Sequence, residues 1–323
     1  MGWAERLSGY LAEKMPHAQE VVIVRAGGMP AGASNETLSI DLRVVCDGLS
    51  FELPLVLRPQ RSDGILAPYD VERQYRVIRA LSRSAVPVPA VAWFERDLEV
   101  LGAPFFLMHR LKAETLPLFW YGGQSPRLTA AAEALATIHA VDWRAAGLSF
   151  LLPGGEGETF RSPIECEIDA WTVKAQRMGA ARLELAPALE RYLRANEPAD
   201  ARHTLVHGDP NPGNYLFRGN EVVAVVDWEL AAIGDPRSDL GFYAALAAIF
   251  GGAYGAEPGR SVLSEAYEAV TGQALANMAY YEAFGLYRML VVMAGWGGGG
   301  FGFYGADTIS RRLAELLGPR WGV

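Results

Sequence analysis

The chain has 323 residues, half of them apolar and one fifth charged, with a formal net charge of −8. This balance, without any run of Lys or Arg, excludes the electrostatic footprint of a nucleic-acid-binding protein. The two cysteines, Cys46 and Cys166, have no neighbours at zinc-ligand spacing, so we expect reduced thiols and a cytoplasmic location. Residues 1–14 include acidic side chains and lack the apolar core of a signal peptide.

The N-terminal third predicts a small α+β lobe, residues 1–110. Five segments rich in Val, Ile, Leu, Phe or Thr are bounded by Gly, Pro or charged turns and predict strands at 21–25, 36–46, 51–57, 91–95 and 104–109. One helix is expected between the third and fourth strands, over residues 70–82, with Asp70 as its N-cap and apolar residues at helical spacing.

The remainder, residues 111–323, predicts a larger, mostly helical lobe. Apolar periodicity indicates helices at 129–141, 164–177, 187–195, 261–271 and 274–294, and Gly272 is placed as a C-terminal stop. Residues 240–256 and 289–306 carry no charge, but the first is short for a bilayer and the second holds seven glycines. We therefore expect buried helices and a Gly-rich loop, and no membrane.

One strand-rich island in the helical half carries the strongest chemical signal. His207-Gly208-Asp209 is followed by Asn214 and then by Asp227. The order H-x-D-x-x-x-x-N with a later aspartate matches the phosphoryl-transfer residues of protein kinases. Turn residues Gly219-Asn220 predict a hairpin in which Arg218 pairs with Glu221 and Asn214 with Val225. That register puts Asn214 and Asp227 on one face, where an amide and a carboxylate can share a Mg²⁺ ion.

The same segment carries a family resemblance. HGDPNPGN followed by VVDWELAAIGDPRSDLG resembles the aminoglycoside-phosphotransferase, or choline-kinase-like, family, closest to the branch found fused to acyl-CoA dehydrogenases. The likeness extends over roughly residues 21–317 and includes VERQYRVIRAL and ALATIHAVDW. It implies a bilobal protein-kinase-like fold that binds ATP or GTP and Mg²⁺.

The resemblance also implies roles for individual residues. Asp209 would be the catalytic base, Asn214 and Asp227 the metal ligands, and Glu229 an additional metal ligand. His207, Asp235 and Asp239 are expected to brace the catalytic loop and the helix that begins near Ser238. The implied activity is transfer of a γ-phosphoryl group to a hydroxyl of a small molecule; the alternative is a nucleotide-binding pseudokinase that acts as a regulatory module.

The nucleotide lobe lacks the usual strand lysine, because the three lysines are Lys14, Lys112 and Lys174. Arg58, at the end of the third strand, is the candidate for the phosphate-binding cation, with Glu72 as its ion-pair partner. The rival interpretations are that Arg61 is the cation and that Glu72 pairs with Arg76 on its own helix.

Three further elements complete the expected sites. The loop over residues 25–37, with Gly27, Gly28, Gly32 and Ser34, is a candidate phosphate cover, although a simple hairpin loop explains it equally well. Residues 107–111, including Met108 and Arg110, are the expected hinge whose backbone meets the adenine. The acceptor walls are expected from Trp120, Tyr121, the helix over 165–171, Tyr243 and residues 296–304. This aromatic composition favours a less charged, partly apolar hydroxyl compound over an aminoglycoside. The sequence does not indicate the oligomeric state.

Overall fold

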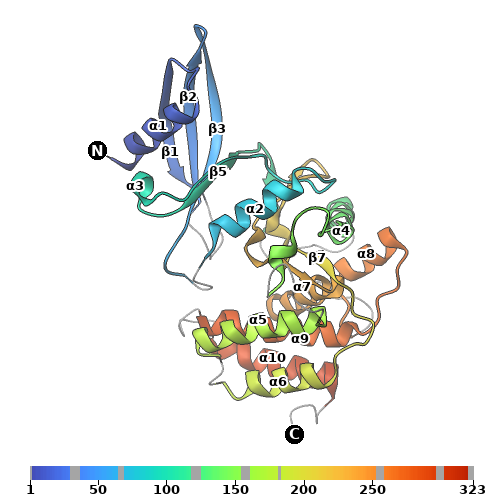
Figure 1. Cartoon of the computed structure of the whole chain (residues 1–323). Coiled ribbons are helices and arrows are strands. Elements are labelled where there is room, and N and C mark those ends of the chain that lie inside the picture. The colour runs from blue at the N-terminus through green and yellow to red at the C-terminus, as the bar shows by residue number, and fades with distance from the viewer. Residues whose placement is uncertain are drawn as a thin grey trace. The chain divides into compact units, whose positions relative to one another are not determined.

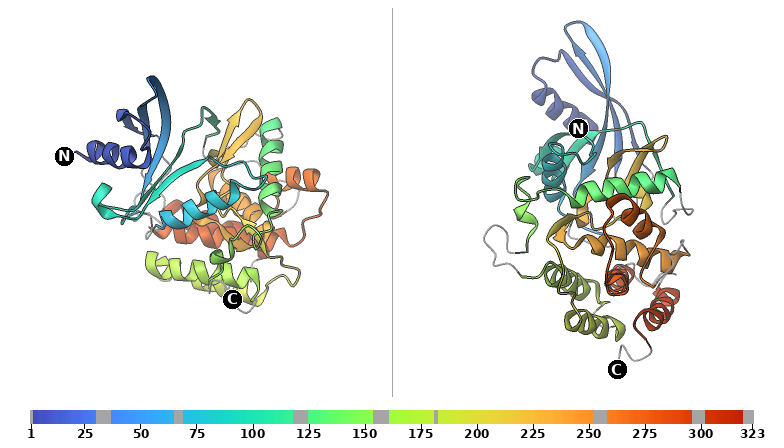
Figure 2. Two further views of the ribbon diagram at one scale, coloured as in Figure 1. Left: turned by 45° about the horizontal axis from the view of Figure 1, so that its top comes forward. Right: turned by 90° about the vertical axis from the view of Figure 1, so that its right-hand side faces the viewer.

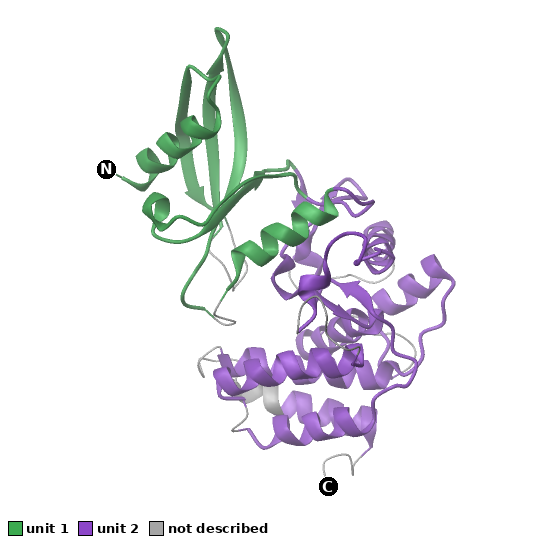
Figure 3. Cartoon of the chain, in the orientation of Figure 1, with its two compact units in different colours: residues 1–82, 89–112 green, residues 83–88, 113–323 purple. Residues whose placement is uncertain are grey.

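The computed structural model describes residues 2–29, 37–64, 69–117, 125–153, 161–180, 183–251, 258–295 and 302–318, without the side chains of 302–306. The chain divides into two compact units, shown in Figure 3. The first comprises residues 1–82 and 89–112, and the second comprises residues 83–88 and 113–323. The chain therefore passes between the units after residues 82, 88 and 112, whereas the sequence had suggested a single boundary after residue 110.

The first unit is built on an antiparallel sheet with the strand order β1-β2-β3-β5-β4 (Figure 1). Its strands are β1 (Glu20–Gly28), β2 (Leu38–Cys46), β3 (Leu49–Pro59), β4 (Val91–Glu95) and β5 (Phe105–His109). The β2–β3 hairpin turns at Asp47-Gly48, both with positive φ, as a two-residue type I′ turn requires. This tight turn fixes the register that brings Arg58, near the end of β3, opposite Phe106 on β5.

Helices α1 (Trp3–Lys14), α2 (Val71–Leu81) and α3 (Leu98–Leu101) complete this unit. The sequence predicted one helix in this unit, and that prediction is wrong because α1 and α3 are also present. The buried residues of α1 are Leu7, Tyr10 and Leu11, a narrow stripe that packs on the sheet core and is hard to see among polar neighbours. Helix α2 begins as predicted, because the side chain of Asp70 accepts the N–H of Arg73 at 2.8 Å.

The second unit contains the longer helices. They are α4 (Pro126–His139), α5 (Pro163–Met178), α6 (Leu185–Ala195), α7 (Pro236–Phe250), α8 (Val262–Thr271), α9 (Met278–Gly295) and α10 (Gly302–Leu317). Its strands are β6 (Glu114–Thr115), β7 (Thr204–Val206), β8 (Tyr215–Arg218), β9 (Glu221–Val225) and β10 (Ala232–Gly234), and its short 3₁₀ helices are η1 (Ser149–Leu151), η3 (Pro212–Asn214) and η4 (Trp228–Leu230). Gly272 ends α8 in the left-handed conformation, as expected. Helix α10 was not predicted.

Helix α9 lies at the centre of the helical layers and packs against α5, α6, α7 and α10 (Figures 1 and 2). It crosses α7 at two glycines. A Cβ on Gly241 would stand 2.3 Å from the backbone of Tyr281, and one on Gly285 would stand 2.6 Å from the carbonyl oxygen of Gly241. The two helices therefore need glycine at this crossing, and their backbones come into direct contact. No helix in the described part of the chain is long and apolar enough to cross a bilayer.

Candidate active site

The predicted catalytic loop, residues 207–214, begins where strand β7 ends. Its central residue, Gly208, has φ +84°, and a Cβ there would stand 2.2 Å from the carbonyl oxygen of Leu230. Glycine is therefore required for both conformation and space. The tight turn directs the chain from the buried strand into Asp209, which is partly exposed.

A buried carboxylate on α7 holds this loop by its backbone. Asp239 accepts the N–H of His207 through Oδ2 and the N–H of Gly208 through Oδ1, each at 2.8 Å. His139 of α4 supports the same carboxylate, with Nε2 3.1 Å from Oδ2. Although burial alone would raise the pKa of Asp239, the hydrogen bond and charge of His139 hold it below the ordinary value. Asp239 therefore braces the loop as an ionised group, as expected.

His207 has a structural role as well. Its Nδ1 accepts the N–H of Asp209 at 3.2 Å, so the proton must be on Nε2, which lies 2.9 Å from the carbonyl oxygen of Val226. The N–H of Val226 in turn donates to the carbonyl oxygen of Asn214 at 2.9 Å. These bonds tie the catalytic loop to the hairpin that carries the expected metal ligands.

Asp209 and Asn214 are in direct contact. Nδ2 of Asn214 donates to Oδ2 of Asp209 at 3.0 Å and to its carbonyl oxygen at 2.9 Å. Burial raises the pKa of Asp209; the charge of Asp227 also raises it, whereas His207, the Asn214 hydrogen bond and Arg288 lower it. The structure thus brings the three expected residues Asp209, Asn214 and Asp227 into one electrostatic neighbourhood.

The route to this arrangement differs from the predicted hairpin register. Arg218 pairs with Glu221 and Phe217 with Val222 as expected, but Leu216 pairs with Ala224 and Tyr215 with Val225. A bulge at Val223 adds one residue to β9, so the predicted pairing of Asn214 with Val225 is wrong.

Because of the bulge, strand alternation no longer places Asp227 on the same face as Asn214. Asp227 instead leaves the strand with φ +67°, a left-handed conformation that is uncommon outside glycine. Such outliers cluster at functional sites, where surrounding contacts maintain them.

The donor set fits a magnesium ion. With Nδ2 of Asn214 directed to Asp209, its carbonyl Oδ1 is the atom left for a cation, and Asp227 supplies a partly exposed carboxylate. Glu229 follows in η4 and is also partly exposed. No group of three or more His, Cys, Asp or Glu suited to a metal occurs among the described residues. Mg²⁺ needs fewer, because it commonly takes one or two carboxylates and completes its octahedron with phosphate oxygens and water.

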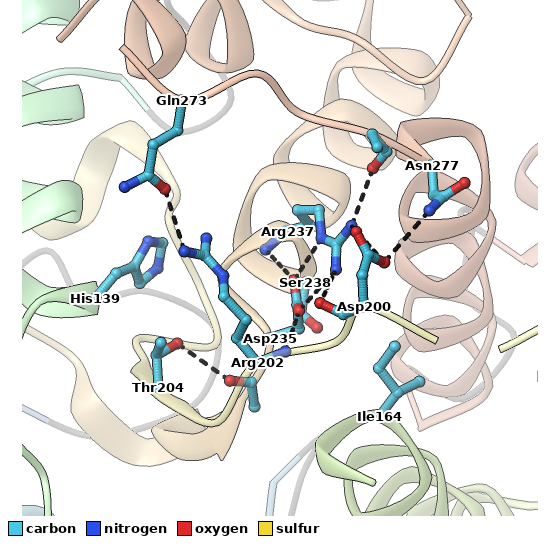
Figure 4. Close-up of polar contacts among 12 residues, drawn as sticks. His139, Ile164, Asp200, Arg202, Thr204, Asp235, Arg237, Ser238, Gln273 and Asn277 are labelled. Atoms are coloured by element: carbon cyan, nitrogen blue, oxygen red, sulfur yellow. Dashed lines mark hydrogen bonds and ion pairs between the residues drawn. The ribbon is translucent and has the colours of Figure 1, made fainter. Parts of the chain in front are cut away.

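Asp235 caps α7 and anchors it through a second buried network, shown in Figure 4. Its carboxylate accepts the N–H of Arg202 at 2.7 Å and both the backbone N–H and the Nε–H of Arg237. Arg237 reaches on to Asp200, which also lies 3.5 Å from the side-chain amide of Asn277. This network fixes the start of the helix that carries Asp239, so Asp235 is structural, as expected.

In the first unit, the predicted ion pair is replaced by a different contact. Arg58 donates to Oγ1 of Thr37 at 3.1 Å and to Oε1 of Gln74 at 3.2 Å. Glu72 pairs with Arg96. The assignment of Glu72 as the partner is therefore corrected to Gln74, two residues further along the helix. Arg61, the rival cation, pairs with Asp63.

The remaining nucleotide-site candidates lie at strand ends of the same sheet. Gly27 and Gly28 end β1, paired with Ser39 and Leu38, whereas Ser34 and Gly32 lie outside the described residues. Met108 is buried in β5 between Val56 and Val91. The N–H of Arg110 donates to the carbonyl oxygen of Pro54 at 3.0 Å, and the guanidinium of Arg110 pairs with Asp41. An adenine contact at Arg110 would therefore not use its N–H.

The expected acceptor walls are met only in part. Trp120, Tyr121 and residues 296–301 lie outside the described residues. Trp171 and Tyr243 are core residues, 5% and 2% exposed. On α5, Asp169 pairs with Arg161 and Arg194 at 2.9 and 2.8 Å, so this acidic side chain is already neutralised.

Sequence reasoning missed two polar side chains of the candidate site. Gln74 shares its helical face with Val71, Val77 and Ile78. A polar residue in this apolar stripe could have indicated a buried polar contact. The other is Arg288, whose guanidinium donates to the carbonyl oxygen of Gly208. Glu282 and Arg288 are the only charged residues of α9, and a lone cation in so apolar a helix could have indicated a special role.

A five-stranded lobe, a helical unit and a braced His-Gly-Asp loop followed by Asn and Asp define a kinase-like phosphotransferase fold. The model of the phosphotransferase enzyme family matches residues 31–281. The chain belongs to this family.

Curated relatives place it in the branch expected from the sequence. It is 34% identical over 222 residues to acyl-CoA dehydrogenase family member 10 of Mus musculus, covering 65% of this chain and 19% of the relative. It is 30% identical over 199 residues to family member 11 of Homo sapiens, covering 58% of this chain and 24% of the relative. The matched region is thus about a fifth to a quarter of the length of these relatives.

Solved structures share the fold over nearly the whole chain. One is a protein from Ralstonia eutropha that was assigned as an aminoglycoside phosphotransferase, with TM-score 0.66, 22% identity, and coverage of 98% of this chain and 96% of the other. Another is aminoglycoside 2′-phosphotransferase-IIIa bound to GDP, with TM-score 0.60, 14% identity, and coverage of 97% and 99%. At these identities the likeness supports the fold.

Proposed function

We propose that this chain is a small-molecule kinase that transfers the γ-phosphoryl group of ATP or GTP to a hydroxyl group. The observation that carries the proposal is the contact between Asp209 and Asn214, held by the Asp239 brace and close to the charge of Asp227. This is the residue set that phosphoryl transfer needs: a carboxylate to orient the hydroxyl, and oxygen ligands for the metal.

In this proposal each residue has a defined task. Asp209 accepts a hydrogen bond from the acceptor hydroxyl and orients it for in-line attack. Asn214 and Asp227, with Glu229 assisting, hold Mg²⁺, which neutralises charge on the phosphates. Arg58, held by Thr37 and Gln74, supplies the cation that the absent strand lysine would supply. Gly27, Gly28 and Met108 border the nucleotide in the first unit.

The proposal includes both ATP and GTP as donors, because structural neighbours bind adenine and guanine nucleotides. Structural neighbours include an aminoglycoside phosphotransferase with ADP and hygromycin B, another with ATP and streptomycin, and the GDP complex described above. For the acceptor, the ion pairs of Asp169 with Arg161 and Arg194 disfavour a polycation, because that acidic side chain already has cationic partners. We therefore propose a less charged hydroxyl compound.

The test is the melting temperature with millimolar ATP or GTP, each with Mg²⁺ or with EDTA. A ligand that binds only the native state raises this temperature by an amount set by its concentration relative to its dissociation constant. A rise that requires Mg²⁺ is expected, together with loss of γ-phosphate in a ³¹P spectrum when hydroxyl compounds are added. A rise without turnover across a broad acceptor panel would favour the regulatory alternative, and no rise would reject nucleotide binding.

A further inference from the structure

Arg288 is a buried cation placed directly behind the catalytic loop. Its side chain is 1% exposed, and Nη2 donates to the carbonyl oxygen of Gly208, the residue before Asp209. The N–H of the same glycine donates to Asp239. The two polar groups of Gly208 are therefore held by two buried side chains of opposite charge, Asp239 from α7 and Arg288 from α9.

The surroundings of Arg288 are unusual for a purely structural cation. Nε and Nη1 have no hydrogen-bond acceptor in the part of the chain that the structure describes. The guanidinium lies instead over the rings of Phe242, Phe284 and Trp171, at 4.0, 5.9 and 4.9 Å from the ring centroids. Aromatic faces replace part of the lost hydration of a cation, although burial of a charge remains costly. A neutral donor would make the same bond to Gly208 without that cost.

The electrostatic partners explain why a charge is retained here. Burial lowers the pKa of Arg288, and the nearby carboxyl groups of Glu167, Asp239 and Asp209 oppose this effect, although Glu167 keeps its own proton up to about pH 8. Asp239 is already bonded to His139 and to the loop backbone. Ser238 donates to Glu167 at 2.7 Å. The charge of Arg288 is therefore available to offset the repulsion between Asp209 and Asp227 across the loop.

The close crossing of α7 and α9 sets the position of this charge. Arg288 follows Gly285 by three residues, within one helical turn. Because α9 contacts the backbone of α7 at Gly285, the start of the Arg288 side chain lies close to α7. The crossing thus sets the position of the Arg288 backbone relative to α7.

We propose that Arg288 is a positioning residue for phosphoryl transfer: it holds the Gly208 carbonyl and, by its charge, keeps Asp209 turned toward the acceptor. The proposal rests on the function proposed above. Arg288 touches neither nucleotide nor acceptor in this role, so its loss affects turnover and leaves nucleotide affinity intact.

The experiment compares Arg288→Met, which removes the charge, with Arg288→Lys, which keeps it. The matched control is Glu282→Gln, which alters the other charged residue of α9, a buried carboxylate bonded to Arg312 on α10. Melting temperature, Mg·ATP affinity and the release of inorganic phosphate from Mg·ATP are measured for each variant. We expect phosphate release to fall about 100-fold in Arg288→Met, the loss typical of a misplaced reacting group. Arg288→Lys should recover most of it, Mg·ATP affinity should stay within about twofold in both variants, and Glu282→Gln should keep parental turnover.

Two outcomes would overturn the proposal: unchanged phosphate release in Arg288→Met, or an equal fall in Glu282→Gln at the same loss of melting temperature. If the parent releases no phosphate, this readout leaves the proposed function to its own test above, because water is not the proposed acceptor. Amide hydrogen exchange then tests the positioning role separately. Faster exchange over residues 207–214 in Arg288→Met than in Glu282→Gln would support it, and equal exchange would reject it.

Discussion

The carboxylate of Asp239 accepts the backbone N–H of His207 at 2.8 Å, which links the start of the catalytic loop to the first turn of α7. The contact joins residues 32 positions apart in a fully buried environment. Because the acceptor is ionised and the donors are backbone groups, the loop is fixed whatever the side chains of its solvent-facing residues do.

Replacing Asp239 should therefore damage both stability and turnover. In Asp239→Asn an amide replaces a carboxylate that accepts from His207, Gly208 and His139, and we expect a loss of about 3 kcal/mol or more in unfolding free energy. Since the folded pKa of Asp239 is depressed, its contribution is present above the unfolded pKa and is lost as the pH falls through the folded pKa. Denaturant titrations at several pH values would measure both effects. Asp142→Asn, at an exposed turn, is the control and should cost far less.

Asp209→Asn separates chemistry from binding. The amide keeps the size of the side chain and loses the negative charge that orients the hydroxyl, so turnover should fall by about 100-fold or more. Mg·ATP affinity, measured by melting shift, should change little. Turnover equal to the parent would remove Asp209 from the catalytic role.

Asp227→Asn should have the opposite pattern. An amide is a weaker ligand for a hard cation than a carboxylate, so nucleotide affinity in Mg²⁺ should fall toward the value measured in EDTA. Isothermal titration with ATP in both buffers would test this. An unchanged difference between the two buffers would exclude Asp227 from the metal site.

The corrected Arg58 contact yields a paired comparison on one helix. Gln74→Leu removes the acceptor that holds Arg58 and should weaken ATP binding about tenfold, the usual effect of losing a hydrogen bond to a charged group. Glu72→Gln, which breaks the pair with Arg96, should leave ATP affinity close to that of the parent. The reverse result would restore Glu72 as the functional partner.

Glu167 should make stability depend on pH. Burial raises its pKa from 4.5 to about 8, against the opposing influence of Arg288. From pH 4.5 to 8 the unfolded chain loses this proton while the folded chain keeps it, so stability falls as the pH rises and levels off above 8. The slope from this group reaches at most about 1.4 kcal/mol per pH unit. Glu167→Gln should flatten the curve in that window, and an unchanged slope would show that the group is ionised throughout.

Local sequence patterns predicted much of the fold. Segments rich in Val, Ile, Leu and Thr marked the strands, and Asp70 and Gly272 marked helix ends, because these features depend on neighbours within a few positions. The segment around Asp209 could be predicted equally well, because the spacing of Asp209, Asn214 and Asp227 in the sequence itself indicates phosphoryl transfer.

What could not be predicted depends on small geometric offsets. The bulge at Val223 changes no composition, yet it shifts Asn214 from Val225 to Val226. The choice between Glu72 and Gln74 turns on the angle around a helix axis. Arg288 meets Gly208 only through the crossing of α7 and α9, which no window of local sequence contains.

The segment 83–88 adds a consequence for how the chain assembles. The carbonyl oxygen of Pro87 accepts the N–H of Val225 at 2.8 Å, so a piece embedded in the first unit's sequence finds its partner only in the late-synthesised hairpin. Contacts so distant along the chain delay folding, because the intervening loop must be closed first. During synthesis, segment 83–88 therefore waits for a hydrogen-bond partner until the β8–β9 hairpin of the same unit has emerged.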